Sequence, residues 1–326
     1  MRGRLSEDVS LVSILIPCRN AAATLGETLA SAIAQDGCEV EVIVADSGST
    51  DASVEIARGF GDPRIRVVEK SGANASSARN AALHAVRGDY IQYLDADDLL
   101  APGKIRLQID ALARHPRHLA FGRWGRFSAD PEAAVFANDD QLRDWTPVEW
   151  LLYALNGGRM MHPAAWLVPR AVAASAGWWD ETLTLNDDGE YFARVIASSD
   201  GLMAVVGARS LYRTTSAPSL SKSRGAAAYT SLLRSLEGTA EVLIGLEDSA
   251  RTRRTAADLM RRFTFYVYPA VPGLRKRAEA LANEWGGSEL VPDLGPKGKL
   301  LSSLIGWRAA LVLAKRRRAL KRSVPW

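Results

Sequence analysis

The chain has 326 residues, of which 47% are hydrophobic and 24% are charged. This composition supports a sizeable core and excludes wholesale disorder, and the length suits one large domain or a domain with an extension. The two cysteines exclude a disulfide framework and a four-thiolate metal site, and the four histidines lack the HExxH and HxH spacings of zinc proteins. No apolar stretch precedes Glu7 and Asp8, which argues against a secretory signal, so we expect a cytoplasmic protein.

Charge is unevenly distributed along the chain. Nine of the 41 basic residues, and none of the 37 acidic residues, lie between Lys297 and Trp326. The rest of the chain is therefore mildly acidic, although the formal net charge of the whole is +4. A basic segment confined to one end argues against nucleic-acid binding by the protein as a whole, and we expect no nucleic acid among its partners.

The first third alternates predicted strands with predicted helices. Runs of β-branched and aliphatic residues predict buried strands at 9–16 and 40–45, and further strands are predicted at 65–68 and 90–94. Apolar residues at helical spacing predict helices at 25–33, 54–57, 75–86 and 102–112. Thr24 and Glu27 resemble a capping box at the start of the first helix. This repetition predicts an α/β fold with a Rossmann-like, mostly parallel sheet and helices on both faces.

The rest of the chain is less regular and then helical. Residues 121–212 contain a predicted strand at 165–168 and a predicted helix at 187–197. The polar segment 216–225 has the composition of a flexible loop, and the apolar stripes of 226–285 predict helices. We therefore expect four parts, which are a domain over 1–215, the loop 216–225, a helical extension over 226–296 and a basic amphipathic tail over 297–326.

Two interpretations of the tail are open. Residues 300–314 are apolar but interrupted by Ser302, Ser303 and Arg308, and they are shorter than the ~20 residues that span a bilayer. Six basic residues follow between Lys315 and Arg322. An apolar helix joined to a polybasic run is typical of a segment that lies on an anionic membrane surface, which would place the protein at the inner membrane face. A docking helix with a solvated basic end has the same composition.

Polar clusters follow three of the predicted strands at the point where each strand ends. They occupy residues 17–20, 46–51 and 95–98. Each cluster alone is explained by helix capping. Together they predict one ligand crevice, because ligands of open α/β sheets bind outside the carboxyl ends of the strands.

The acidic cluster predicts a divalent-metal site. Side chains two residues apart at a strand end face the same way, so Asp95 and Asp97 can bind one cation while Asp98 points elsewhere and suits capping. Two carboxylates with open coordination positions favour Mg²⁺ or Mn²⁺ held jointly with phosphate oxygens. The alternative is acidic capping of the helix after Pro102. No GxGxxG motif follows the first strand, and no P-loop or GxSxG motif is present, which argues against a dinucleotide-binding oxidoreductase, a P-loop NTPase and a serine hydrolase.

The motifs at these strand ends resemble those of glycosyltransferase family 2. Three stretches between residue 9 and about residue 112 carry the likeness, which are VSILIPCRNAAATLGETLASAIAQ, VEVIVADSGSTDAS and ANASSARNAALHAVRGDYIQYLDADD. It extends more loosely through WWDETLTLNDDGEYFARV at 178–195. The resemblance implies a GT-A fold with a donor half at 9–115 and an acceptor half at 120–215. It also implies sugar transfer, with inversion, from a nucleoside diphosphate sugar to a sugar or glycolipid acceptor.

The resemblance assigns five residues to the nucleotide. Pro17 and Arg19 would line the nucleoside pocket, and Asp46 would lie beside the base and ribose. Ser47 stands at the position where the family has a second acid, which is a departure from its pattern. Arg79 matches an arginine near the nucleotide.

The resemblance also assigns the metal ligands and the base. Asp97 and Asp95 would bind Mg²⁺ or Mn²⁺, with Asp95 also near the ribose, and Asp188 would be the catalytic base. From the residues alone, Asp187 and Glu190 resemble a capping box, so these acids could merely begin a helix. With the resemblance, Asp187 is the expected cap and Asp188 faces the crevice. There it would take the proton of the acceptor hydroxyl while the cation neutralises charge on the leaving group.

Two other functions suit the same fold. A catalytically silent relative would bind the nucleotide sugar as a scaffold or sensor. The intact Asp95, Asp97 and Asp188 argue against that function, whereas Ser47 is compatible with it. Nucleotidyl transfer would need a glycine-rich loop with an adjacent Arg or Lys to hold a triphosphate, and we find none in the sequence.

The irregular middle holds two further candidates. Indole faces suit sugar rings, so five tryptophans form a candidate acceptor wall, with core packing as the alternative for most of them. They are Trp145, Trp150, Trp166, Trp178 and Trp179. His162 is a candidate contact of the acceptor or the diphosphate, although a lone histidine is more often structural.

Overall fold

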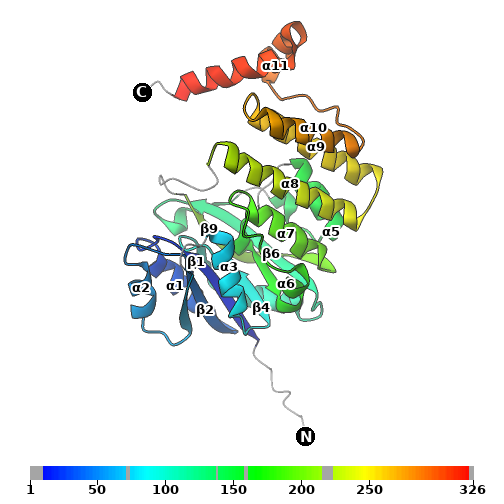
Figure 1. Ribbon diagram of the computed structural model, residues 1–326. Helices are drawn as coiled ribbons and strands as arrows, with labels where there is room; N and C mark the ends of the chain where they lie inside the picture. Colours follow the sequence, from blue (N-terminus) through cyan, green and yellow to red (C-terminus); the bar gives the residue numbers. More distant parts are fainter. Residues whose placement is uncertain (1–9, 71–73, 137–138, 158–160, 215–222, 323–326) are drawn as a thin grey trace.

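The computed structural model describes residues 10–70, 74–136, 139–157, 161–214 and 223–322. The predicted alternation of strands and helices in the first third is confirmed (Figure 1). Its elements are β1 (Leu11–Cys18), α1 (Leu25–Ile33), β2 (Glu39–Asp46), α2 (Ser53–Gly59), β3 (Ile65–Glu69), α3 (Ala75–His84), β4 (Tyr90–Tyr93) and α4 (Lys104–Leu112).

The described strands form one mixed sheet. The strands beyond β4 are β5 (Leu99–Leu100), β6 (His118–Phe127), β7 (Val135–Phe136), β8 (Trp166–Pro169) and β9 (Gly201–Arg213). The order is β3-β2-β1-β4-β8-β6-β9-β5, and β7 pairs with β6. The strands β3, β2, β1 and β4 are parallel, as predicted, whereas β8 runs antiparallel to both β4 and β6. The α/β class is confirmed. Beyond the first third of the chain the sheet is mixed, because β8 is antiparallel to its neighbours while β6 and β9 pair in parallel.

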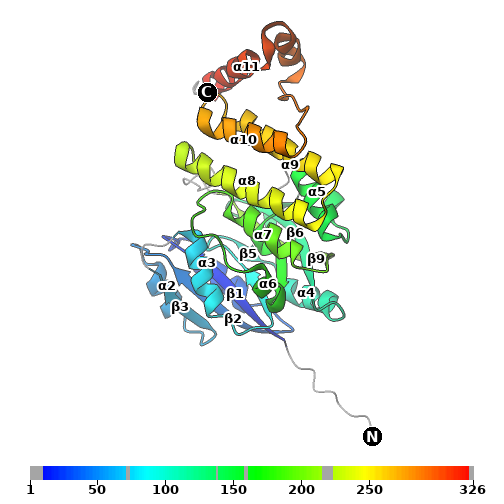
Figure 2. The same cartoon turned by 45° about the vertical axis from the view of Figure 1, so that its right-hand side comes forward.

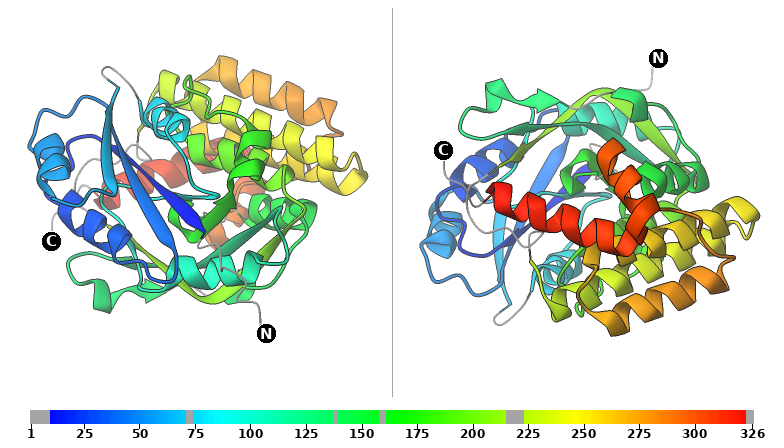
Figure 3. Two further views of the ribbon diagram at one scale, coloured as in Figure 1. Left: turned by 90° about the horizontal axis from the view of Figure 1, so that it is seen from below. Right: turned by 90° about the horizontal axis from the view of Figure 1, so that it is seen from above.

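Helices cover both faces of the parallel part of the sheet (Figure 3, left). Ile14 and Ile16 of β1 pack with Leu29 of α1 on one face. Leu15, between them, packs with Ala78 of α3 on the other face. All five side chains are fully buried. Successive residues of a strand point to opposite faces, so a strand covered on both sides needs the continuous apolar run that this sequence has.

The first helix is not held by the predicted capping box. Thr24 is the N-cap residue of α1, but its side chain makes no cap hydrogen bond. The Thr24 hydroxyl instead donates to the carbonyl of Ala96 at 2.9 Å. A tertiary partner has replaced the local one, and this bond ties α1 to the loop after β4.

A buried lysine lies at the start of α4. Lys104 is fully buried, and its Nζ donates to the side-chain oxygens of Gln92 and Gln108. Burial lowers the pKa of Lys104 well below its ordinary value. The Gln108 amide in turn donates to the carbonyl of Ala165 at 3.0 Å, so this polar group joins α4 to the turn before β8.

Among the described residues of the middle, the α-helices are α5 (Pro147–Gly157), α6 (Arg170–Ala176) and α7 (Asp187–Ala197). The predicted strand at 165–168 and the predicted helix at 187–197 are therefore present as β8 and α7. Most of the expected loop 216–225 lies outside the described residues.

Four helices form the C-terminal region, as the sequence predicts, and they stack away from the sheet (Figure 2). They are α8 (Ala226–Leu246), α9 (Ala250–Val267), α10 (Pro272–Glu284) and α11 (Gly295–Arg322), which is interrupted at Gly306. Helix α8 packs on α7, and its Leu243 belongs to the core of the sheet domain, so the extension adjoins that domain directly. The domain boundaries at 215, 226 and 297 stay predictions. Among the helices of the described residues, none is long and apolar enough to cross a membrane.

The second part of α11 docks on the end of α9. The Trp307 ring lies 5.1 Å from the ring of Phe265 and 5.5 Å from that of Tyr268. Lys315 Nζ donates to the carbonyls of Phe265, Tyr266 and Tyr268 at 3.0, 2.7 and 2.7 Å. These carbonyls end a helix, where backbone acceptors lack intrahelical partners and a cation is favoured. The docking interpretation therefore holds for this part of the tail.

Candidate active site

The loops after β1 and β2 are bonded to each other at the carboxyl edge of the sheet. Asn20 has a left-handed backbone (φ 52°), and its Oδ1 accepts from the Thr50 N–H at 2.8 Å. The Asn20 N–H donates to Ser49 Oγ at 2.9 Å. At the end of β2, the buried Asp46 carboxylate accepts from the N–H groups of Gly48 and Ser49 at 2.9 and 3.0 Å. These bonds fix Asp46 at the base of the loop.

The other predicted nucleotide residues lie on the same edge. Pro17 is half-buried near the end of β1, and Arg19 is exposed in the following turn. Ser47 is buried, and its hydroxyl donates to the carbonyl of Cys18 at 3.2 Å, so it supports the end of β1. Because β1 lies between β2 and β4, Asp46 and the loop after β4 flank the carboxyl end of β1.

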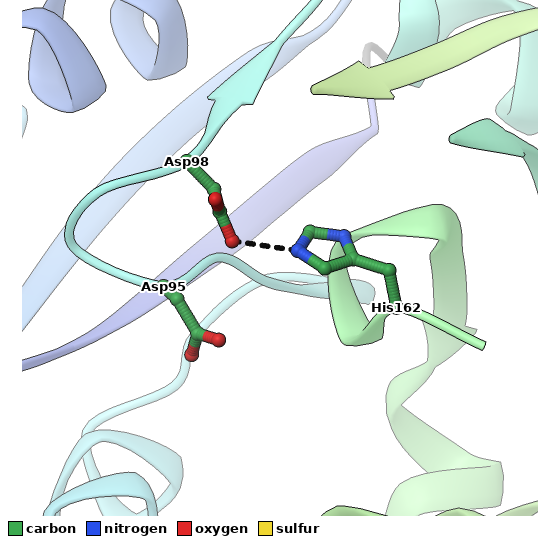
Figure 4. A group of neighbouring side chains, drawn as sticks. All are labelled: Asp95, Asp98 and His162. Carbon is green, nitrogen blue, oxygen red and sulfur yellow. Dashed lines mark hydrogen bonds and ion pairs between the residues drawn. The ribbon is translucent and has the colours of Figure 1, made fainter. Parts of the chain in front are cut away.

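The acidic turn, residues 95–98, follows β4. Asp98 is 1% exposed. One of its oxygens accepts from the Arg213 N–H at 2.7 Å, and the other lies 2.6 Å from Nε2 of the fully buried His162 (Figure 4). The expectation that Asp98 caps the following helix is therefore wrong, because both of its oxygens are bonded to other parts of the sheet domain.

Negative charge is concentrated at this turn. Burial, reinforced by the charges of Asp98 and Asp95, raises the pKa of Asp97 to about 6. One ligand atom each of Asp95, Asp98 and His162 lie within 4.8 Å of one another. This set differs from the predicted pair Asp95 and Asp97, and its histidine is 64 residues from Asp98. The sequence offered no signal for that pairing beyond the presence of a lone histidine.

Arg79 connects the acidic turn to α7. Its guanidinium is largely buried and donates to Asp95 Oδ1 at 3.0 Å and to Asp187 Oδ2 at 2.8 Å. It also lies over the Trp179 ring, 4.5 Å from the centroid. Two carboxylates from distant segments are therefore held on one arginine, whose planar fork suits such pairing.

Asp188 lies next to this ion pair, at the second position of α7. Its Oδ1 accepts from the N–H of Gly189 at 2.9 Å. Burial raises the pKa of Asp188, and the charge of Asp187 raises it further, while Arg79 partly offsets both. The Asp188 side chain is half-buried. A partly desolvated carboxyl with a raised pKa is suited to accept a proton from a substrate.

The predicted capping box of α7 does not form. Asn186 is the N-cap residue, in a left-handed conformation (φ 60°) and without a side-chain cap. Asp187 binds Arg79, as described, and accepts from Ser76 Oγ at 3.0 Å. Glu190 binds Arg194 one turn further along, at 2.6 Å. The expectation that Asp187 is the cap is wrong, because its carboxylate is used by α3.

The extension helix α8 fixes the segment that precedes Asp188. Buried Ser231 Oγ accepts from the N–H groups of Thr184 and Leu185 at 2.8 and 3.0 Å. Buried Ser235 Oγ accepts from Asn186 Nδ2 at 2.6 Å and donates to the Asn186 carbonyl at 2.7 Å. The extension therefore helps to hold the start of α7, a role that helical periodicity alone did not indicate.

Four of the five candidate wall tryptophans belong to the core. Trp145, Trp150, Trp166 and Trp179 are 7%, 3%, 1% and 2% exposed and pack in one apolar cluster. Core packing is thus the right interpretation for these four. Trp178 is 50% exposed.

Comparisons with known proteins agree with this geometry. Residues 13–169 match the model of Glycosyl transferase family 2. An uncharacterized glycosyltransferase of Rickettsia typhi is 28% identical over 191 residues, which are 58% of this chain and 59% of that protein. The succinoglycan biosynthesis protein ExoO of Rhizobium meliloti is 36% identical over 100 residues, 30% of this chain and 29% of that protein. The chain thus spans less than two thirds of the length of these curated relatives.

A solved structure shares the fold. Residues 1–349 of S. aureus TarS, in complex with UDP-GlcNAc, superpose with a TM-score of 0.67 at 14% identity. The match covers 84% of this chain and 81% of that chain. The fold is of the GT-A type, and the chain carries a domain of glycosyltransferase family 2.

Proposed function

We propose that the chain is an inverting glycosyltransferase that moves a sugar from a nucleoside diphosphate sugar to an acceptor hydroxyl in polysaccharide or glycoconjugate synthesis. The observation that carries the proposal is the pair of bonds from Arg79 to Asp95 and Asp187, which holds the acidic turn beside Asp188. The family of residues 13–169 supports this chemistry. The TarS complex with UDP-GlcNAc supports the donor class, and the likeness to ExoO supports a polysaccharide product.

The nucleoside is proposed to lie across the carboxyl ends of β1 and β2. Pro17 and Ser47 would form the floor there, since both lie at or beside strand ends. Asp46, where its loop begins, would contact the nucleobase and the ribose. Arg19, whose side chain is exposed in the adjoining turn, would bring positive charge towards the diphosphate.

The acidic turn is proposed to hold Mg²⁺ or Mn²⁺ through Asp95 and Asp97. Carboxylate oxygens fit both ions. The raised pKa of Asp97 also fits, because a bound cation would stabilise its ionised form. We assign Asp98 and His162 to the support of the turn, since both oxygens of Asp98 are already bonded. A cation bound there would neutralise the charge that develops on the departing diphosphate.

Asp188 is the proposed general base. Its carboxylate would accept the proton of the attacking hydroxyl, a role that contributes about 10²–10⁴-fold to the rate. Arg79 would keep the neighbouring Asp187 occupied, which leaves Asp188 as the acid of this pair that is open to substrate. A single displacement with one base inverts the anomeric carbon and needs no nucleophile from the enzyme.

A thermal-stabilisation screen tests donor and metal together. The chain would be heated with UDP-, GDP- and dTDP-sugars in the presence of Mn²⁺ or of a chelator. We expect at least one nucleotide sugar to raise the Tm, with a larger shift in Mn²⁺, because a ligand that binds only the folded state stabilises it. A screen in which no nucleotide sugar shifts the Tm would contradict the proposed donor class.

Matched variants test which acids hold the ion. Asp97→Asn should lose the Mn²⁺-dependent part of the shift, whereas His162→Ala should lower the Tm of the free protein and keep that part. If His162→Ala lost the Mn²⁺-dependent part of the shift and Asp97→Asn kept it, the ion would instead be bound by Asp95, Asp98 and His162.

The first part of α11 is proposed to bring the protein to an anionic membrane, where a glycolipid acceptor would lie. Leu300 and Leu304, one helical turn apart, are 67% and 76% exposed. The basic run that follows supports an anionic surface. We expect the full chain to sediment with phosphatidylglycerol vesicles but not with phosphatidylcholine vesicles. Leu304→Glu should reduce sedimentation. Val291 is 67% exposed and lies outside α11, so Val291→Glu should not reduce it. Equal sedimentation of both variants would contradict this role.

A further inference from the structure

A cavity of about 360 Å³ lies against α3, on a face that the proposed mechanism does not use. Four of its lining residues, Ser77, Asn80, Ala81 and His84, recur at the spacing of one helical face. Ser76 and Arg79 both bind Asp187, so the face of α3 that carries them points towards α7 and differs from the face that lines the cavity. Helix α3 therefore separates this cavity from the ion pair beside Asp188.

The other walls come from the end of β3 and from residues 178–181. Lys70 lines the cavity, and its N–H donates to the carbonyl of Asp46 at 2.8 Å, so this wall adjoins the end of β2. Trp178 and Glu181 line the opposite wall. The cavity thus begins beside the carboxyl edge of the sheet and continues along α3 as far as His84.

Trp178 presents an aromatic face on a rigid backbone. Trp178 is 50% exposed, and its ring stacks on the His84 ring with centroids 4.2 Å apart. The Trp178 carbonyl accepts from Arg194 Nη2 at 2.8 Å. The backbone of the next residue, Trp179, exchanges two hydrogen bonds with Asn80, at 2.9 and 3.0 Å. An exposed indole held in this way binds a ligand without first having to be ordered.

We propose that this cavity binds a sugar ring of the growing acceptor chain. An indole face packs against the C–H face of a pyranose, and the hydroxyls at the ring edge need both donors and acceptors. Lys70 Nζ supplies donors. Ser77 Oγ, whose proton is donated to the Asn74 carbonyl, and the Glu181 carboxylate supply acceptors. Pockets for small ligands have this mixture of apolar surface and a few polar groups. The identity of the ligand as an acceptor rests on the proposed function, whereas binding of a sugar ring does not.

Binding of oligosaccharides to the full chain tests the proposal. The probes are three tetrasaccharides, of β-linked N-acetylglucosamine, β-linked glucose and α-linked mannose, titrated calorimetrically without nucleotide up to ~1 mM, the range of weak binding. We expect one of them to bind wild type. Trp178→Ala should weaken that binding about tenfold, the effect of losing one stacking contact. Trp178→Phe should retain most of it, because a ring face is kept.

Tyr266→Ala is the matched control, since Tyr266 is 43% exposed on α9, outside the cavity. We expect it to bind the probe as wild type does. The absence of binding to wild type, or equal binding by wild type and Trp178→Ala, would overturn the proposal. Nucleotide-sugar stabilisation is measured on the same variants and should be unchanged in Trp178→Ala. A failure of the proposed function would therefore show in that assay, and a failure of the sugar site in the calorimetry.

Discussion

Replacing Arg79 by methionine removes a positive charge that is bonded to both Asp95 and Asp187. Methionine keeps an unbranched side chain that can still pack on Trp179, so the change isolates the charge. Removing one partner of a buried ion pair costs about 3–5 kcal/mol, because the other partner is left without compensation. The Arg79 side chain is 9% exposed, but those of Asp95 and Asp187 are 33% and 18% exposed, so water partly solvates the carboxylates left behind. We therefore expect Arg79→Met to lower the free energy of unfolding by an amount near the lower end of that range, about 3 kcal/mol.

Urea denaturation of wild type and variant measures this loss through the midpoint and slope of the transition. The matched control is Arg277→Met, which breaks the pair with Glu237 on an arginine side chain that is 60% exposed. Exposed ion pairs contribute up to about 1 kcal/mol to stability, so the free energy of unfolding of Arg277→Met should differ little from that of wild type. If Arg79→Met lost no more stability than Arg277→Met, Arg79 would not be the charge that holds the acidic turn to α7.

The same variant has a second readout in the pH dependence of transfer. Arg79 lowers the pKa of Asp188 against the upward effects of burial and Asp187. Its removal therefore raises the pKa of Asp188. A general base acts only when ionised, so the acid limb of the rate profile should move to higher pH in Arg79→Met. An acid limb at the same pH as in wild type would mean that Asp188 is not the group that titrates.

Three further variants test other parts of the structure. Asp188→Asn should keep nucleotide-sugar stabilisation but lower turnover about 10²–10⁴-fold, and retained transfer would place the base elsewhere. Ser235→Ala removes two hydrogen bonds to Asn186. It should lower kcat about tenfold with an unchanged donor KM, the effect of about 1.4 kcal/mol felt in the transition state, and an unchanged kcat would refute the positioning role. For Lys104, whose folded pKa is lowered from its ordinary value of 10.5, the unfolded state binds more protons below that value, so wild-type stability falls as pH falls. Lys104→Met removes this dependence, so its free energy of unfolding relative to wild type should rise by up to about 1.4 kcal/mol for each unit by which the pH falls. A difference between the two proteins that does not change with pH would show that Lys104 stays charged.

Local patterns in the sequence were sufficient for the elements of the first third and for the strand ends at which the candidate site residues lie. The runs around Ile14 and Ile43 predicted strands covered on both faces, because a strand alternates sides and only a doubly covered one is apolar throughout. Polar residues directly after those strands then predicted the edge on which Asp46 and Asp95 lie, since parallel strands end at a common edge.

Capping was predicted less well, for a common reason. Thr24 and Asp187 both stand at helix starts, and both have side chains that can bond the nearby backbone. In the structure Thr24 donates to Ala96, and Asp187 binds Arg79, 108 residues away. A local rule weighs only neighbours in the chain, so it fails where a distant group forms the stronger bond.

The sequence by itself determined the α/β class, the strand ends that carry the polar residues and, through its motifs, the family. The tertiary structure alone decided that Arg79 joins Asp95 to Asp187, that Asp98 pairs with His162, and that α8 holds the segment before Asp188. Elements follow from periodicities of two to four residues, which a sequence displays directly. Contacts between residues 49, 64 and 108 positions apart depend on how whole elements pack, and no local pattern records that.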